Sequence, residues 1–257
     1  MPSCLSRLLV CAAVIGNLIG CDTVRNSLPT VKTVIQSTSS AALEPATWAP
    51  LAGAAILGAT GWDKDLSDWA AIENPVFGSQ ENAASASDIL RDGLVGGMVT
   101  SSFLAPVNGA YHNIPARRVA ANAMAFGTAS AVVNGLKGAV GRQRPNNGND
   151  RSFPSGHAVA AFTSGSLIEQ NLNQNIHDPR LQASIKAGSL VLATATAWAR
   201  VEGKKHFPAD VLVSAAIGNF FARSFFDAFV SADESDRTSF ALEATQDSMA
   251  LRYTRSF

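Results

Sequence analysis

The stretch AWARVEGKKHFPADVLVSAA (residues 197–216) joins two apolar segments through a short polar turn. Arg200 ends the uncharged run that begins at Ala187. Pro208 suits the first position of a new helix, because a backbone N–H at that position would have no partner within the helix and proline lacks one. The segment 201–205 is predicted to be the loop between the two helices. His206 and Asp210 would then lie beside Arg200 at a helix start, where the carboxylate could accept the Nδ1 proton of the imidazole.

Two other stretches carry similar residue types. In Lys137-x6-Arg144-Pro145 the two cations are seven residues apart, which places them on one face of a helix that Pro145 would end. In the tetrapeptide Pro-Ser-Gly-His (154–157), proline and glycine break the chain just before an apolar run. We expect a helix whose first turn carries these residues, with free backbone N–H groups that point at an anion.

Together these residue types match the needs of phosphoryl transfer. Negative charge spreads over the phosphate oxygens as the phosphoryl group moves, so the reaction needs fixed donors and an aligned nucleophile. Lys137, Arg144 and Arg200 are cationic donors, and a neutral His206 could attack phosphorus through Nε2. The sequence alone therefore predicts a site for phosphate esters.

The order Lys-x6-Arg-Pro, Pro-Ser-Gly-His, Arg-x5-His-x3-Asp resembles the signature of the type 2 phosphatidic acid phosphatase superfamily. That superfamily includes bacterial class A acid phosphatases and vanadium-dependent haloperoxidases. The resemblance covers residues 137–210 and implies a helical-bundle phosphatase that forms a phosphohistidine. It implies that His206 is the nucleophile, Asp210 its orienting partner and His157 the general acid and base. The implied phosphate ligands are Lys137, Arg144, Ser155, Gly156 and Arg200. One departure is Ala199, where the family usually has serine.

Three alternatives to a phosphatase follow from the same residues. His157, His206 and Asp210 could bind Zn²⁺, but three nearby cations would repel a divalent ion, so we expect no metal and no cofactor. A haloperoxidase would hold vanadate in the same anion pocket. A non-catalytic envelope protein would keep the pocket only to bind phosphate. The leading hypothesis is a metal-independent phosphatase acting on phosphomonoesters or on lipid phosphates or pyrophosphates.

The first 20 residues are typical of a secretory signal peptide, with one early basic residue and a short apolar run. Leu-Ile-Gly-Cys (18–21) resembles a bacterial lipobox, which predicts a lipid on Cys21 and a membrane-anchored protein on the periplasmic side. Asp22 favours retention at the inner membrane. Residues 21–46, rich in Ser, Thr and Val, are predicted to be a tether.

Residues 47–232 are predicted to form one all-α bundle, because strand patterning is nearly absent and long uncharged Ala-rich runs dominate. Residues 233–257 alternate apolar and polar side chains, which indicates a hairpin on the surface or at a homo-oligomer contact. Small side chains favour a water-soluble body, with a multi-span membrane domain as the alternative. Balanced charge, with 20 basic and 20 acidic residues, gives no sign of nucleic-acid binding. The expected helices are 51–59, 83–103, 114–141, 157–171, 179–200 and 208–230.

Overall fold

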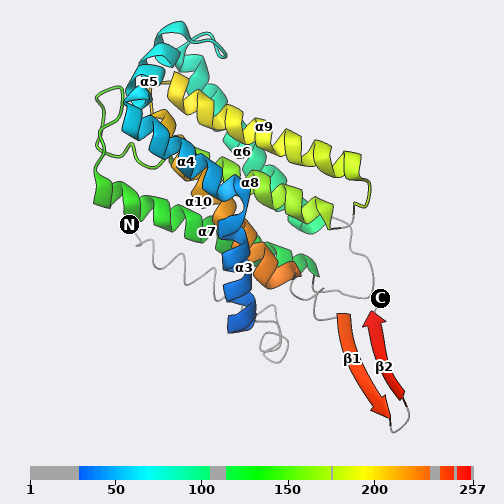
Figure 1. The fold of residues 1–257 in the computed structure, drawn as a ribbon. Helices are drawn as coiled ribbons and strands as arrows, with labels where there is room; N and C mark the ends of the chain where they lie inside the picture. The colour runs from blue at the N-terminus through cyan, green and yellow to red at the C-terminus, as the bar shows by residue number, and fades with distance from the viewer. Residues whose placement is uncertain (1–28, 105–113, 175, 232–237, 246–247, 256–257) are drawn as a thin grey trace, which may run out of the picture.

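The computed structural model describes residues 29–104, 114–174, 176–231, 238–245 and 248–255. The predicted signal peptide and Cys21 lie outside these residues. The described body is a helical bundle, which confirms the all-α prediction (Figure 1). Its elements are α3 (Val31–Leu43), α4 (Pro45–Thr60), α5 (Trp62–Glu73), α6 (Gln80–Leu104), α7 (Ile114–Val140), α8 (Gly156–Asn173), α9 (Pro179–Glu202), α10 (Pro208–Phe226) and the short π-helix η1 (Asp227–Ser231).

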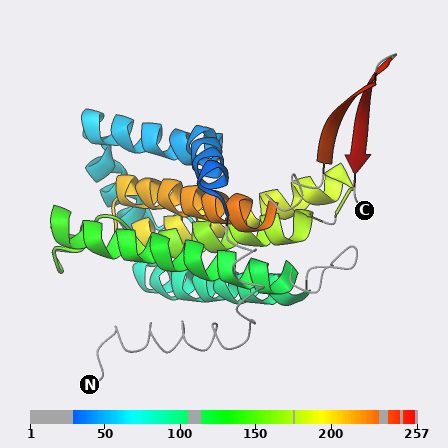
Figure 2. The ribbon, with the colours of Figure 1, turned by 90° about the horizontal axis from the view of Figure 1, so that it is seen from below.

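Helix α10 lies at the centre of the bundle and packs on α8, α4, α7 and α3 (Figures 1 and 2). Small side chains permit this close packing. A Cβ atom added to Gly218 of α10 would lie 2.9 Å from the backbone nitrogen of Thr163 in α8, closer than real Cβ atoms come. Larger apolar side chains such as Leu167 and Phe226 fill the core at the far half of the same helix pair. The Ala- and Gly-rich composition therefore sets the helix spacing.

Helix α7 ends earlier than a helix reaching Pro145 would. Gly141 adopts a left-handed conformation (φ 60°), and its N–H bonds to the carbonyl of Lys137 at 3.3 Å, a common helix ending. Arg144 therefore lies in the loop after the helix, and the prediction that it shares a helical face with Lys137 is wrong. Helix α9, by contrast, continues to Glu202, two residues into the predicted loop. Glu202 is buried and accepts a hydrogen bond from the backbone N–H of Phe77, which stabilises the added turn.

Two helices were not expected from the sequence. Helix α3 occupies part of the predicted tether, begins with Thr30 as a side-chain cap, and packs on α10 with Ser37 and Ala41 buried. Helix α5 is polar, with Asp63 and Asp65 in its first turn, where carboxylates stabilise a helix. Tertiary packing outweighs the weak local propensity of these two segments.

The C-terminal segment contains β1 (Thr238–Thr245) and β2 (Ser248–Arg255), which pair antiparallel with Thr238 opposite Arg255. This is the hairpin that the alternating pattern indicates, and it projects away from the helices (Figures 1 and 2). Two helical segments of the described chain, Pro115–Val140 and Pro208–Ser231, are long and apolar enough to cross a membrane by length and composition. Half of the second is buried inside the bundle, as a core helix would be.

The close approach of α8 and α10 predicts opposite effects for two glycine substitutions. Gly218→Ala should lower the melting temperature, because overpacking costs about 1–3 kcal/mol and exceeds the roughly 1 kcal/mol that alanine gains in helix propensity. Gly188→Ala is the control, since nothing lies within 4 Å of the added Cβ on α9. It should raise the melting temperature or leave it unchanged. Equal behaviour of the two variants in thermal unfolding would contradict this packing.

Candidate active site

One end of the bundle gathers the motif residues. The C-terminus of α7, the loop 141–155, the N-termini of α8 and α10, and the C-terminus of α9 meet there, with the loop at the left of Figure 1. Hydrogen bonds tie these pieces together. The backbone N–H of Ser155 donates to the Oγ of Ser214 at 2.7 Å, and the carbonyl of Arg200 accepts from the N–H of His206 at 3.2 Å. The three sequence motifs therefore form one site.

His206 is almost fully buried, and its Nδ1 lies 2.6 Å from the carbonyl oxygen of Ser152. A carbonyl only accepts, so Nδ1 carries the proton and Nε2 keeps its lone pair. The expected partner was Asp210, whose Oδ2 is 3.7 Å from Nδ1, beyond hydrogen-bond distance. The expected tautomer is therefore present, but the backbone of Ser152 enforces it.

The imidazole of His206 is also held neutral. Burial lowers its pKa to about 4, because a charged ring would lose its hydration, and the positive charges of Lys137 and Arg200 act in the same direction. The negatively charged carboxylate of Asp210 opposes this shift without reversing it. At neutral pH the ring is a buried base with an available lone pair.

Asp210 holds the turn that carries His206. Its carboxylate is fully buried and accepts hydrogen bonds from the Oγ of Ser152 at 2.5 Å and the N–H of Phe207 at 2.9 Å. Arg142, which the sequence analysis did not select, donates to its other oxygen at 2.8 Å. Asp210 thus holds the side chain of Ser152 and the backbone directly after His206, and makes no direct hydrogen bond to the ring.

Two arginines present buried donors without acceptors. The Nε atoms of Arg144 and Arg200 are buried and have no hydrogen-bond partner among the described residues. The side chain of Arg200 is anchored at Nη1, which donates to the Oγ of Ser87 at 3.0 Å. The two guanidinium groups are close enough for the charge of Arg144 to lower the pKa of Arg200. A buried donor left unpaired is costly, so this pair favours an anionic ligand.

Lys137 lies at the same site but has partners of its own. Its Nζ donates to the carbonyl oxygens of Pro154 and Arg151, the latter at 3.0 Å. These bonds fix the loop that leads into α8. An ammonium group has three N–H donors, so one stays free for an anion. The positive charge of Lys137 also reaches His206, whose pKa it lowers.

Ser155 and Gly156 begin helix α8. Ser155 is the N-cap: its Oγ accepts the N–H of Ala158 at 3.3 Å, and the residue is fully buried. Gly156 is the first helical residue, and first-turn N–H groups have no partner within a helix. The expected helix start is therefore present, with the positive end of its dipole at the site.

His157 follows on the first turn of α8 and contacts two charged residues of α6. Its Nε2 lies 2.6 Å from the Oδ1 of Asp88 and also meets the guanidinium of Arg91. Asp88 can accept from a protonated Nε2, and Arg91 can donate to a bare one, so each protonation state of the ring has a partner. Burial, followed by the charge of Arg200, lowers the pKa of His157, while Asp88 raises it.

Sequence reasoning missed several residues of this site. Four of them lie on α5 and α6, far from the motifs in the chain, and these helices carry many similar polar residues, so no local spacing distinguishes them. Two others, in the loop 141–155, lie within or beside the motifs. The one available signal was a second arginine, two residues before Arg144, in the segment Gly-Arg-Gln-Arg-Pro (141–145). The missed residues are Asp63, Ser87, Asp88, Arg91, Arg142 and Ser152.

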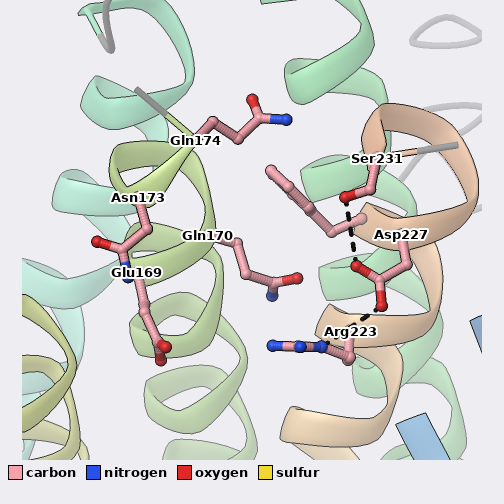
Figure 3. Close-up of a pocket in the computed structure, with 8 residues that line it drawn as sticks. Glu169, Gln170, Asn173, Gln174, Arg223, Asp227 and Ser231 are labelled. Carbon is pink, nitrogen blue, oxygen red and sulfur yellow. Dashed lines mark hydrogen bonds and ion pairs between the residues drawn. The ribbon is translucent and has the colours of Figure 1, made fainter. Parts of the chain in front are cut away.

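A pocket of about 200 Å³ lies at the opposite end of the bundle from the motif residues, between the C-terminal ends of α8 and α10 (Figure 3). Eighteen residues of α8 separate the two ends, or roughly 25 Å at 1.5 Å per residue. Its lining includes Glu169, Gln170 and Asp227, and no motif residue. Across the described residues, no group of three or more His, Cys, Asp or Glu is placed to hold a metal ion.

The chain is similar to known proteins in its fold and in part of its sequence. The chain resembles the solved structure of a transmembrane PAP2-type phosphatidylglycerolphosphate phosphatase from Bacillus subtilis, with a TM-score of 0.53 and 20% sequence identity over 74% of this chain and 94% of that chain. This likeness concerns the fold. No curated protein sequence matches the chain. Residues 118–232 match the model of the PAP2 superfamily and include every motif residue described above. The chain is therefore similar to the PAP2 superfamily over residues 118–232, which are less than half of its length.

Proposed function

We propose that this protein is a phosphatase that hydrolyses phosphomonoesters or lipid phosphates and pyrophosphates through a phosphohistidine on His206. The similarity to the PAP2 superfamily supports phosphatase activity in general. The observation that carries the finer proposal is the pair of buried Nε donors of Arg144 and Arg200 beside a neutral imidazole. Donors that find no acceptor in the protein are suited to phosphate oxygens.

In the proposed reaction, Nε2 of His206 attacks phosphorus and the bond to the leaving oxygen breaks. His157 gives its proton to the leaving alkoxide, then takes a proton from the water that hydrolyses the phosphohistidine. Arg144, Arg200, the free N–H of Lys137 and the first-turn amides of α8 neutralise the phosphoryl oxygens. Asp88 favours the protonated His157 and Arg91 the neutral ring, so the pair supports both halves of the cycle.

We further propose that the protein acts at a membrane in the bacterial envelope, on the periplasmic side, held there by a lipid on Cys21. Exposed aromatic side chains support membrane contact: Trp48, Trp62 and Trp69, on α4 and α5, are about half exposed or more, at 52%, 61% and 48%. Tryptophan is enriched at membrane–water interfaces. Asp63 of α5 accepts a hydrogen bond from the first turn of α10 and so belongs to the site. Trp62 directly precedes Asp63 in the sequence. This arrangement favours a lipid phosphate as substrate.

The first prediction concerns the covalent intermediate. Rapid-quench experiments with a labelled phosphate ester should trap an acid-labile phosphoenzyme in the wild type and none in His206→Ala. His157→Ala should still label with an activated ester such as p-nitrophenyl phosphate, whose leaving group needs no proton. Its turnover of an alkyl phosphate should fall about 10²–10⁴-fold, the usual contribution of general acid–base catalysis. His177→Ala, an exposed histidine on another part of the chain, is the control. Labelling of His206→Ala would rule out this nucleophile.

The second prediction concerns pH. The reaction needs neutral His206, whose pKa is about 4, and protonated His157, whose pKa burial and the charge of Arg200 lower from its ordinary value. The profile of kcat/KM for an alkyl phosphate should therefore be bell-shaped, rising as His206 loses its proton and falling before neutral pH as His157 loses its own. A bound dianion stabilises protonated His157, so the falling limb of kcat should lie at higher pH than that of kcat/KM. A rate that still climbs above about pH 9 would contradict these assignments.

The third prediction concerns the anchor. After a carbonate wash, which removes peripherally bound proteins, the wild type should stay in the membrane pellet. A processed Cys21→Ser variant should move to the supernatant, because a body rich in Ala, Gly, Ser and Thr is only weakly driven to insert into a bilayer. Fractionation followed by immunoblotting measures this. Retention of the processed variant would mean that the helices themselves span the bilayer.

A further inference from the structure

Arg142 bridges two carboxylates that come from distant parts of the chain. Its Nη1 donates to Oδ1 of Asp210 at 2.8 Å, and its Nη2 donates to Oδ2 of Asp63 at 2.6 Å. The guanidinium carbon also lies 3.9 Å from the ring centre of Phe207, in a cation–π contact. Arg142 lies between Lys137 and Arg144 in the sequence, and the proposed reaction assigns it no role.

Asp63 completes this bridge from outside the PAP2 match. It belongs to α5, and its side chain is only 7% exposed. Its second oxygen, Oδ1, accepts the N–H of Ala209 in the first turn of α10 at 2.7 Å. Both oxygens of Asp63 therefore act on the turn 206–210, one directly and one through Arg142. A buried carboxylate is costly unless its oxygens are paired, so these two hydrogen bonds fix the position of Asp63 relative to the turn.

The bridge leads to the imidazole of His206 by two short routes. Asp210 accepts from Arg142 on one oxygen and from the Oγ of Ser152 on the other, while the carbonyl of Ser152 holds Nδ1 of His206. Phe207, which follows His206 directly, contacts Arg142 by its ring and Asp210 by its N–H. Movement of Arg142 would therefore disturb both the backbone directly after His206 and the acceptor of its Nδ1 proton.

We infer that Asp63 and Arg142 are positioning residues for His206. They orient its imidazole, and through Asp210 they influence the electrostatic environment of the ring. This inference rests on the proposed role of His206 as nucleophile. The charged groups that face His206 are Asp210, Lys137 and Arg200, and Arg142 offsets the charge of Asp210. Asp63 in turn offsets the charge of Arg142. The two residues therefore influence His206 with opposite sign.

Substitutions of Arg142 and Asp63 should therefore shift the pKa of His206 in opposite directions, which a purely structural role of the two residues would not produce. In Arg142→Gln, two carboxylates lose their shared cation, so the pKa of His206 should rise. In Asp63→Asn, Arg142 loses one counter-charge and the pKa of His206 should fall. Both variants should lower kcat by about tenfold or more with little change in KM, since misaimed reacting groups lose rate more than binding. The acid limb of kcat/KM should move to higher pH in the first variant and to lower pH in the second.

Matched controls separate this effect from loss of fold. Asp65→Asn removes the same charge from the same first turn of α5, but at an exposed residue, and should change neither kcat nor the pH limb. Arg142→Lys keeps the charge but has no planar fork for two carboxylates, so it should lose kcat while the limb stays near its wild-type position. Thermal unfolding of each variant checks that the protein is folded.

The charge effect can also be measured without turnover. NMR titration of ¹⁵N-labelled histidines, with the His206 signal assigned by its absence in His206→Gln, gives the pKa of His206 in each variant. Shifts in opposite directions support the inference even if the protein hydrolyses no ester, in which case the proposed function alone fails. Shifts of the same sign, or none in either folded variant, would overturn it while leaving the phosphohistidine mechanism intact.

Discussion

The concentration of positive charge at one end of the bundle is the constraint on which the site depends. Lys137, Arg144 and Arg200 are close enough to influence one another, and burial removes much of the water that would screen them. Asp210 is the buried carboxylate among them, and Arg142 already shares its charge. The site therefore carries an excess of positive charge, and the same charge helps to keep His206 neutral.

Holding that charge in place requires a rigid backbone, which the close packing of α8 and α10 supplies. Gly218 lets α10 approach Thr163 of α8, and Ser214, one turn before Gly218, accepts the N–H of Ser155. The start of α8 and the start of α10 are thus fixed relative to each other. Since His157 lies on the first and Asp210 on the second, small residues in the core determine the geometry of polar residues at its edge.

Much of the fold and the identity of the site could be predicted from the sequence, because long Ala-rich runs mark helices and the motif order is specific. The local details could not. Gly141 ends α7 before Pro145, so Arg144 reaches the site from a loop. The carbonyl of Ser152 takes the part expected of Asp210, and a backbone acceptor leaves no trace in side-chain spacing. Asp63 and Asp88 are separated from their partners by 146 and 69 positions, and only tertiary structure brings them together.

Helices α5 and α6 supply side chains that contact both histidines or their supports, yet both precede residue 118, where the superfamily match begins. The three motifs therefore do not form the site by themselves. A fragment limited to the matched residues would keep every motif residue but lose the charged partners on α5 and α6. The same would hold for a chimaera that joins the matched residues to the leading helices of another protein. The residues that match the superfamily therefore do not include all of the charged residues that support the site.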